Sequence, residues 1–237
     1  MRFRELRIEA SPAASDHGVL PSGIAFRWTA HHVREIFSAV LPRDTTLDGS
    51  SVIQITCGPR VAGPLYHRAL GSSEYFVEDF DFTHYARASP RDREVLLLQV
   101  IETALHDIAR LVGAEPTPIE VAAQRVRDCS FALTQEVARL KRKIPNSPCA
   151  IRVFRSLSNE LGESWLMRVC PPTGAAIEEV VMGKSPSYLD RREFYRAAEI
   201  EGANYIVRDT RGRETFRFDI VHLLSDGSLT RQSSGRH

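Results

Sequence analysis

The sequence has few cysteines, and their spacing excludes the common cysteine-based sites. The four of them are Cys57, Cys129, Cys149 and Cys170, with no Cys-x-x-Cys pair among them. Zinc ribbons and thioredoxin-like redox sites both need such closely spaced pairs. Each cysteine stands among apolar residues, so we expect reduced thiols in the interior, which is typical of a protein in a reducing cytoplasm.

Long apolar runs and an excess of one charge are also lacking. No stretch approaches the roughly 20 apolar residues that span a bilayer. No apolar segment follows the basic N-terminal residues, as it would in a secretory signal. With 31 basic and 30 acidic residues the formal net charge is +1, so no overall field favours nucleic acid or an anionic membrane. We therefore expect a cytoplasmic, globular protein.

Sequence motifs for catalysis are absent as well. The chain contains no Gly-x-Ser-x-Gly, Walker, Gly-x-Gly-x-x-Gly or His-Glu-x-x-His motif. His31 and Glu35 stand four apart on a predicted helix, where a solvated helix start is favoured over a metal site. Glu102 and His106 have the same spacing and are typical of an ordinary side-chain pair, although a carboxylate can also orient a histidine for acid–base work. We predict no catalytic residue, no metal site and no cofactor.

The pattern of the first two thirds predicts a mixed α/β fold of the α+β kind. Apolar alternation indicates strands near residues 1–9, 24–28 and 51–57, with a helix capped by Thr29 between the last two. Residues 11–23 and 59–73 are predicted loops. Capping signals at Ser89-Pro90 and Thr117-Pro118 predict two long helices, Ser89–Gly113 and Thr117–Ile144. Because only a few residues join them, we expect a central antiparallel helical hairpin packed on mostly antiparallel sheet.

The last third is predicted to be a β-meander. Strands are expected at Ala150–Leu157, Trp165–Cys170 and Ile177–Met182, and a hairpin at Asn204–Asp209 and Glu214–His222. Residues 190–198 are expected to form a short helix or an irregular segment. The predicted organisation is an α/β region over 1–144 with the hairpin at about 89–144, a meander region over 149–224 and a flexible tail over 225–237. The first two regions can also form one continuous domain.

The most informative stretch is Glu74–Phe82, which holds four carboxylates and four aromatic rings in nine residues. As a continuous strand it has no cleanly apolar face, so a bulge or turn near Glu78-Asp79 is needed to direct the rings inward and the acids outward. One interpretation is an edge strand whose charges prevent aggregation. The other is an acidic surface that binds a basic partner. The residues predicted to bind a partner are the charges Glu74, Glu78, Asp79 and Asp81 and the anchors Tyr75 and Tyr85.

Two basic segments have simpler explanations. Arg139, Lys141, Arg142 and Lys143 stand where the end of a predicted helix favours cations, and contact with phosphate is the less favoured interpretation. The segment 188–196 interleaves aromatic residues with arginines, a pattern that suits a protein interface or RNA. Given the balanced charge, nucleic acid is not the expected partner.

The general pattern resembles the immunity proteins of bacterial toxin systems. It is carried by Tyr75–Phe82, by the helices Ser89–Gly113 and Thr117–Ile144, and by the meander Ile151–Ile220. The resemblance implies a non-enzymatic, stoichiometric inhibitor that covers or plugs a cognate toxin domain. Immunity proteins against nucleases are often strongly acidic, so the near-neutral charge does not favour a nuclease as the toxin. The alternatives are an enzyme of an unrecognised class that uses His106 with Glu102, and an adaptor or structural subunit of a larger assembly.

Overall fold

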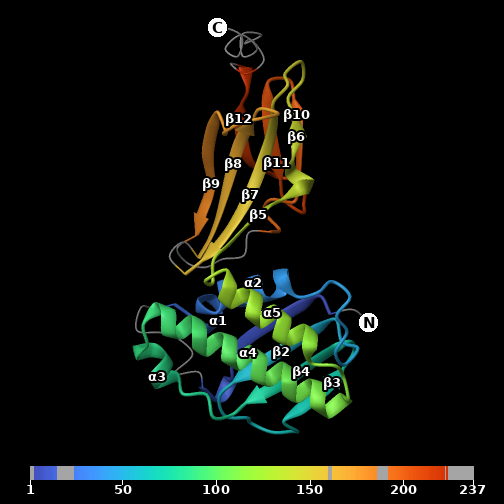
Figure 1. Cartoon of the computed structure of the whole chain (residues 1–237), viewed down its shortest axis with the longest axis vertical. Coiled ribbons are helices and arrows are strands. Elements are labelled where there is room, and N and C mark those ends of the chain that lie inside the picture. Colours follow the sequence, from blue (N-terminus) through green and yellow to red (C-terminus); the bar gives the residue numbers. More distant parts are fainter. Residues whose placement is uncertain (1–2, 15–23, 160–161, 186–191, 222, 224–237) are drawn as a thin grey trace, which may run out of the picture. The chain divides into compact units, whose positions relative to one another are not determined.

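The computed structural model describes residues 3–14, 24–159, 162–185, 192–221 and 223. These residues form two compact units (Figure 1). The first unit holds 3–14, 24–133, 157–159 and 162, and the second holds the other described residues. Helices and strands are both abundant, and most strands across the three sheets pair antiparallel, so the predicted mixed α/β class is confirmed.

The sheet of the first unit has the strand order β1-β2-β4-β3. Its strands are β1 (Glu5–Ala10), β2 (Val52–Cys57), β3 (Tyr66–Ala69) and β4 (Ser72–Val77). The pairs β1–β2 and β2–β4 are parallel, whereas β3 pairs antiparallel with β4 at one edge. Thus the sheet beneath the helices is largely parallel, while the sheets of the second unit make the fold mostly antiparallel. Residues 59–73, a predicted loop, contain β3 and the start of β4.

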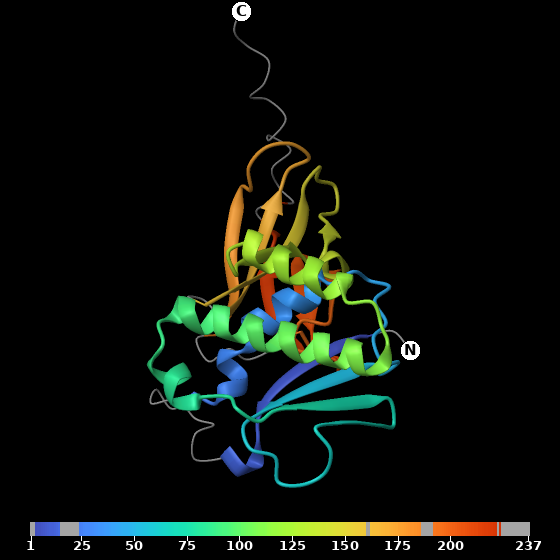
Figure 2. The same cartoon turned by 60° about the horizontal axis from the view of Figure 1, so that its bottom comes forward.

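Helices cover one face of this sheet (Figure 2). They are α1 (Phe26–Thr29), α2 (His31–Val40), α4 (Pro90–Val112) and α5 (Thr117–Asp128). The short helix α3 (Phe82–Arg87) precedes α4, and the 3₁₀ turn η1 (Pro12–Ala14) follows β1. The predicted ends of α4 are confirmed: the Ser89 hydroxyl accepts from the Asp92 amide, and Gly113 ends the helix with φ +69°. Helix α5 follows after four residues and packs against α4.

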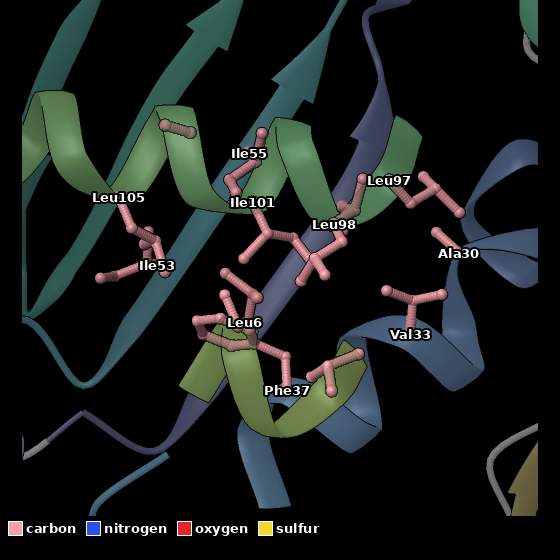
Figure 3. Packing of buried hydrophobic residues seen from close by; sticks show 14 of the residues in the cluster. Leu6, Ala30, Val33, Phe37, Ile53, Ile55, Leu97, Leu98, Ile101 and Leu105 are labelled. Carbon is pink, nitrogen blue, oxygen red and sulfur yellow. The ribbon is translucent and has the colours of Figure 1, made fainter. Parts of the chain in front are cut away.

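Apolar side chains of α4 face the buried side of the sheet (Figure 3). Leu97, Leu98, Ile101 and Leu105 are buried, as are Ile53 and Ile55 on β2. Leu6 on β1 and Val33 and Phe37 on α2 complete this part of the cluster. The buried residues recur every three or four positions along the helices and every second position along the strands. Each element therefore has one apolar face, and these faces pack together in one core.

Two further local predictions are wrong. Residues 24–28 were expected to alternate as a strand, but Phe26 and Thr29 are both buried at helical spacing in α1, and Ala30 rather than Thr29 is the N-cap of α2. The helix predicted from Thr117 to Ile144 ends at Asp128, because Ser130 and Phe131 both adopt positive φ. The chain then forms β5 (Leu133–Glu136), the 3₁₀ turn η2 (Ala138–Leu140) and β6 (Arg142–Lys143).

The second unit consists of two sheets. One has the order β5-β7-β8-β9, with β6 also paired to β7, and the other has the order β10-β11-β12. The remaining strands are β7 (Ala150–Ser158), β8 (Gly162–Cys170), β9 (Glu178–Ser185), β10 (Ala197–Glu201), β11 (Asn204–Arg208) and β12 (Glu214–Asp219). The structure therefore has strands in each predicted part of the meander, and β10 begins within the segment expected to be irregular. The predicted tail at 225–237 lies outside the described residues.

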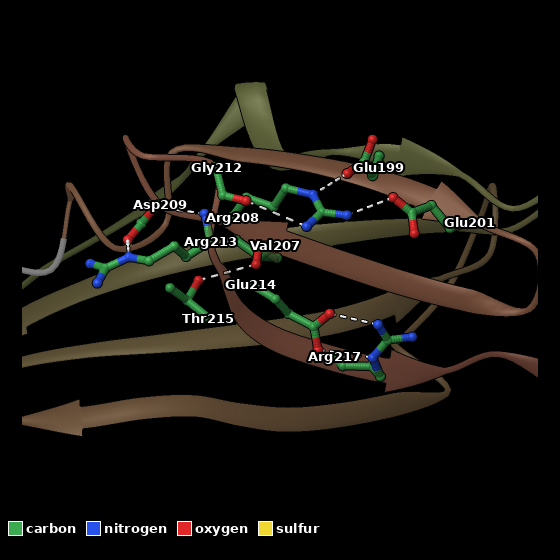
Figure 4. Close-up of polar contacts among 10 residues, drawn as sticks. All are labelled: Glu199, Glu201, Val207, Arg208, Asp209, Gly212, Arg213, Glu214, Thr215 and Arg217. Atoms are coloured by element: carbon green, nitrogen blue, oxygen red, sulfur yellow. Dashed lines mark hydrogen bonds and ion pairs between the residues drawn. The ribbon is translucent and has the colours of Figure 1, made fainter.

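A separate apolar cluster fills the second unit, with Trp165 and Tyr205 as its largest fully buried side chains. The Trp165 indole donates to the buried Glu163 carboxylate at 2.6 Å, and Arg155 donates to the same carboxylate at 2.6 Å. The predicted hairpin is confirmed as β11–β12. Asp209 stabilises its turn by accepting from the amides of Arg211 and Arg213. Figure 4 shows Asp209 beside Arg213.

Outside this turn, the exposed face of β10-β11-β12 carries arginine–carboxylate pairs. Arg208 lies between Glu199 and Glu201 and pairs with both, and Arg217 pairs with Glu214 (Figure 4). These groups satisfy one another at the surface, and pairs of this kind contribute little to stability individually.

Candidate partner-binding site

The acidic and aromatic segment turns sharply at Glu78-Asp79, as the sequence predicted. Strand β4 ends at Val77 and α3 begins at Phe82. The turn allows Phe80 and Phe82 to enter a ring cluster with Phe26, with ring centroids 5.1 and 5.2 Å from that of Phe26. The rings of Phe80 and Phe82 therefore pack against the core, whereas the carboxylates of the segment lie closer to the surface.

Both predicted tyrosine anchors lie in the core. Tyr75 is 6% exposed and its hydroxyl donates to Asp107 at 2.5 Å. Burial and this hydrogen bond raise the pKa of Tyr75 to about 12. Tyr85 is 1% exposed, and its hydroxyl lies 2.8 Å from that of Thr29. Both rings are therefore packed in the core, and the Tyr85 side chain also lines the hollow described below.

The predicted acidic residues do not form one surface. Glu74 lies on the sheet face opposite the buried Tyr75 and accepts hydrogen bonds from Gln54 and Thr56. Glu78 pairs with Arg60 at 3.3 Å. Both carboxylates are therefore already engaged within the first unit.

Asp79 and Asp81 line a surface hollow of about 280 Å³ beside α4. Asp79 is exposed and makes no ion pair with any residue that the structure describes. Asp81 is the N-cap of α3, where its side chain accepts from the His84 amide at 2.8 Å. The full lining is Val77, Asp79, Phe80, Asp81, His84, Tyr85, Leu96, Gln99, Val100 and Thr103.

The lining from α4 comes from a second face of that helix. Leu96, Gln99, Val100 and Thr103 repeat at spacings of three and four, so they stand in one row. The row is offset from Leu97, Leu98 and Ile101, which face the core. Leu96 and Val100 are only half-buried and form apolar walls, whereas Gln99 and Thr103 are exposed. The hollow thus combines apolar walls with a rim that carries two carboxylates.

Sequence reasoning missed His84, Gln99 and Thr103, which complete the polar part of the lining. One signal was present. The apolar residues of Ser89–Gly113 cover a wide face of the helix, and Leu96 and Val100 lie outside the row that packs on the sheet. Only the position of the β4–α3 turn shows that these two residues lie next to Asp79 and Asp81.

The histidine candidates take other positions. His31 and Glu35 are buried on α2, and Arg34 contacts both, at 3.1 Å from His31 Nδ1 and 2.9 Å from Glu35. Thus the helix start predicted to be solvated is buried. Glu102 pairs with Arg127 rather than with His106, which is half-buried and does not line the hollow. Among the described residues, no group of three or more His, Cys, Asp or Glu side chains is arranged to hold a metal ion.

The basic run predicted at a helix end lies in the second unit, around η2 and β6. There Arg139 donates to the main-chain carbonyl oxygens of Tyr195 and Arg196, at 3.1 and 3.2 Å. Tyr188 and Arg191 of the aromatic and basic segment lie outside the described residues. Cys57 and Cys149 are buried free thiols, and Cys129 and Cys170 are half-buried free thiols.

Comparison with known proteins adds no relative. No protein-family model matches the chain, and searches of curated proteins and of solved structures returned no match. Of the helices that the structure describes, none has both the length and the apolar character needed to cross a membrane.

Proposed function

We propose that this chain is a cytoplasmic, non-enzymatic protein that binds another protein through the hollow beside α4. One observation carries the proposal: two exposed carboxylates without ion-pair partners among the described residues, Asp79 and Asp81, stand over apolar walls. Such a surface suits a partner segment that presents an aliphatic or aromatic side chain next to a lysine or arginine. The apolar side chain would fill the hollow, and the cation would pair with the rim.

The partner class that we propose is a toxin domain, with this chain acting as its immunity protein. Support comes from the pattern of an acidic segment followed by α4, α5 and a meander. Carboxylates over apolar walls suit inhibition by occlusion, since such a hollow can hold a side chain of the toxin domain.

The experiment is affinity capture of the tagged full-length chain from its host, with quantitative mass spectrometry. The test variant combines Asp79→Lys with Asp81→Asn. The asparagine removes the charge and still caps α3. The matched control is Asp44→Lys, which reverses an exposed carboxylate outside the hollow.

We expect the wild type and Asp44→Lys to retain one stoichiometric partner, and the double variant to lose most of it at an unchanged melting temperature. Expression of that partner alone should stop growth of a test host, and co-expression of the wild type should restore it. Equal capture by the double variant would remove the hollow from the proposal. A captured partner that is harmless on expression would reject the immunity role while keeping the binding role.

A further inference from the structure

β3 is an edge strand of the first unit's sheet. It pairs with β4 on one side, and no described strand pairs with it on the other. The pairing continues beyond its N-terminal end, because the Phe76 amide donates to the Leu65 carbonyl at 3.0 Å. No bulge interrupts the β3–β4 register. Residues 65–69 therefore present a regular strand edge to the outside.

The register shows which main-chain groups face outward. Residues 70 and 71 form a two-residue turn between Ala69 and Ser72. The residues flanking such a turn exchange both main-chain hydrogen bonds, and the exchange recurs at every second pair, here His67 with Glu74. The amide and carbonyl groups of Tyr66 and Arg68 consequently point away from β4. They are spaced as an added strand requires.

The turn itself holds an unusual side chain. Leu70 has φ +50° and is fully exposed at 106%. Positive φ is costly for leucine, and asparagine or glycine is the usual residue at this position of a hairpin turn. Leu70 contributes nothing to the core in return. With Leu65, which is 40% exposed at the other end, it gives the edge an apolar group at each end.

Arg68 is the cation that this edge offers to a partner. Of the other basic side chains in residues 59–71, Arg60 pairs with Glu78 and His67 lies 3.6 Å from Glu74. Arg68 is exposed and donates to the main-chain carbonyl of Asp48, and it makes no ion pair with any residue that the structure describes. Residues 59–71 hold no acidic residue. The edge therefore suits a strand that places a carboxylate opposite Arg68.

We propose that β3 is a strand-addition site that binds an extended acidic segment of another protein, with apolar residues at the two ends of that segment. Main-chain hydrogen bonds to Tyr66 and Arg68 would hold the added strand. A carboxylate of that strand would face Arg68, and its apolar ends would contact Leu65 and Leu70. This surface is separate from the hollow beside α4, since the two share no residue.

The test uses the full-length protein and a fluorescein-labelled synthetic peptide of about six residues, the usual length of a strand. The peptide alternates valine and glutamate, and its partner peptide replaces each glutamate by lysine. In fluorescence anisotropy we expect the glutamate peptide to bind at least about tenfold more tightly. Amide hydrogen exchange should slow at Tyr66 and Arg68 on binding, whereas His67 and Ala69 should change little because β4 already protects them.

Arg68→Glu should invert the preference between the two peptides, and Arg87→Glu, the same charge change on exposed α3, should leave it unaltered. Arg68→Pro should abolish binding, because proline removes an outward-facing amide that β4 does not use. Equal affinity for both peptides, no binding of either, or protection that does not fall on Tyr66 and Arg68 would each overturn the proposal. Self-association of the protein that is lost in Arg68→Glu would overturn the choice of partner.

Discussion

His32 Nε2 lies 2.9 Å from Glu94 Oε1, and this contact joins the start of α2 to the first turns of α4. Both side chains are buried. Glu94 also accepts from Arg91 at 3.1 Å through its other oxygen, and the Arg91 guanidinium stacks over the Phe131 ring. One buried carboxylate thus connects α2, α4 and the residues that follow α5. Since buried polar groups are costly when a partner is removed, this contact should matter to stability.

Glu94→Ala is therefore expected to lower the free energy of unfolding by about 2 kcal/mol, because it leaves the buried His32 Nε2 without its hydrogen-bond partner. Glu94→Gln should cost less, since the amide oxygen can still accept one hydrogen bond. The measurement is urea unfolding of each variant, with Glu120→Ala on the exposed side of α5 as the control. If Glu94→Ala unfolds like Glu120→Ala, the contact does not stabilise the protein.

Gly58 should tolerate no side chain. It follows β2 with φ +100°, and an added Cβ would lie 3.0 Å from the Ala14 Cβ and 3.1 Å from the Phe82 ring. Gly58→Ala combines backbone strain with overpacking, and we expect a loss of more than about 2 kcal/mol. Gly63 has φ +85° but open space around it, so Gly63→Ala isolates the strain and should cost about 1 kcal/mol. Thermal unfolding of both variants measures the difference, and equal losses would show that space at Gly58 is unimportant.

The end of α5 shows where sequence periodicity reaches its limit. Ile119, Ala123 and Val126 mark a helical stripe, and Leu140 and Ile144 continue it at the same spacing. The first three are buried in the cluster of the first unit, whereas Leu140 and Ile144 are buried in that of the second. A regular spacing predicts one helix but cannot report that the residues enter different cores. Neither Ser130 nor Phe131 is a residue that signals positive φ.

Local capping was more informative because its chemistry is complete within a few residues. Ser89 and Gly113 cap the two ends of α4, and Pro90 occupies its first turn, where an amide would have no partner in the helix, as predicted. The β11–β12 hairpin followed from the alternation of apolar residues and from a turn that contains glycine. The candidate site was less accessible to sequence. Tyr75 and Glu74 are neighbours in the sequence, but Tyr75 lies on the buried face of the sheet and Glu74 on the opposite face. Only the position of α4 decides which face is buried. The hollow forms because Asp79 lies near Leu96 in space. The sequence does not show this proximity, since the two residues belong to different segments.

Ser130 gives a prediction from the same helix end. It is exposed with φ +52°, a conformation that glycine adopts without strain. Ser130→Gly should raise the free energy of unfolding by up to about 1 kcal/mol, and Ser130→Val should lower it because a β-branched residue is strained there. Chemical denaturation of the pair checks both directions. A destabilised glycine variant would mean that α5 continues beyond Asp128 in solution.

Alkaline titration should report the burial of Tyr75. Its pKa in the folded protein is about 12, raised by burial and by the hydrogen bond to Asp107, against about 10 in the unfolded chain. Between these values the folded state keeps a proton that the unfolded state has lost. The stabilising contribution of Tyr75 is therefore complete below pH 10 and is lost as pH rises toward 12.

The measurement is phenolate absorbance of the wild type and Tyr75→Phe, together with urea unfolding at pH values on both sides of 10. The phenylalanine variant should lack one late-titrating phenol and should lose less stability between pH 10 and 12. Tyr66, whose pKa burial and Asp48 also raise to about 12, is the internal control, since its titration should persist. If the missing phenol instead titrates near 10, Tyr75 is open to solvent, and its place as a partner anchor would be restored.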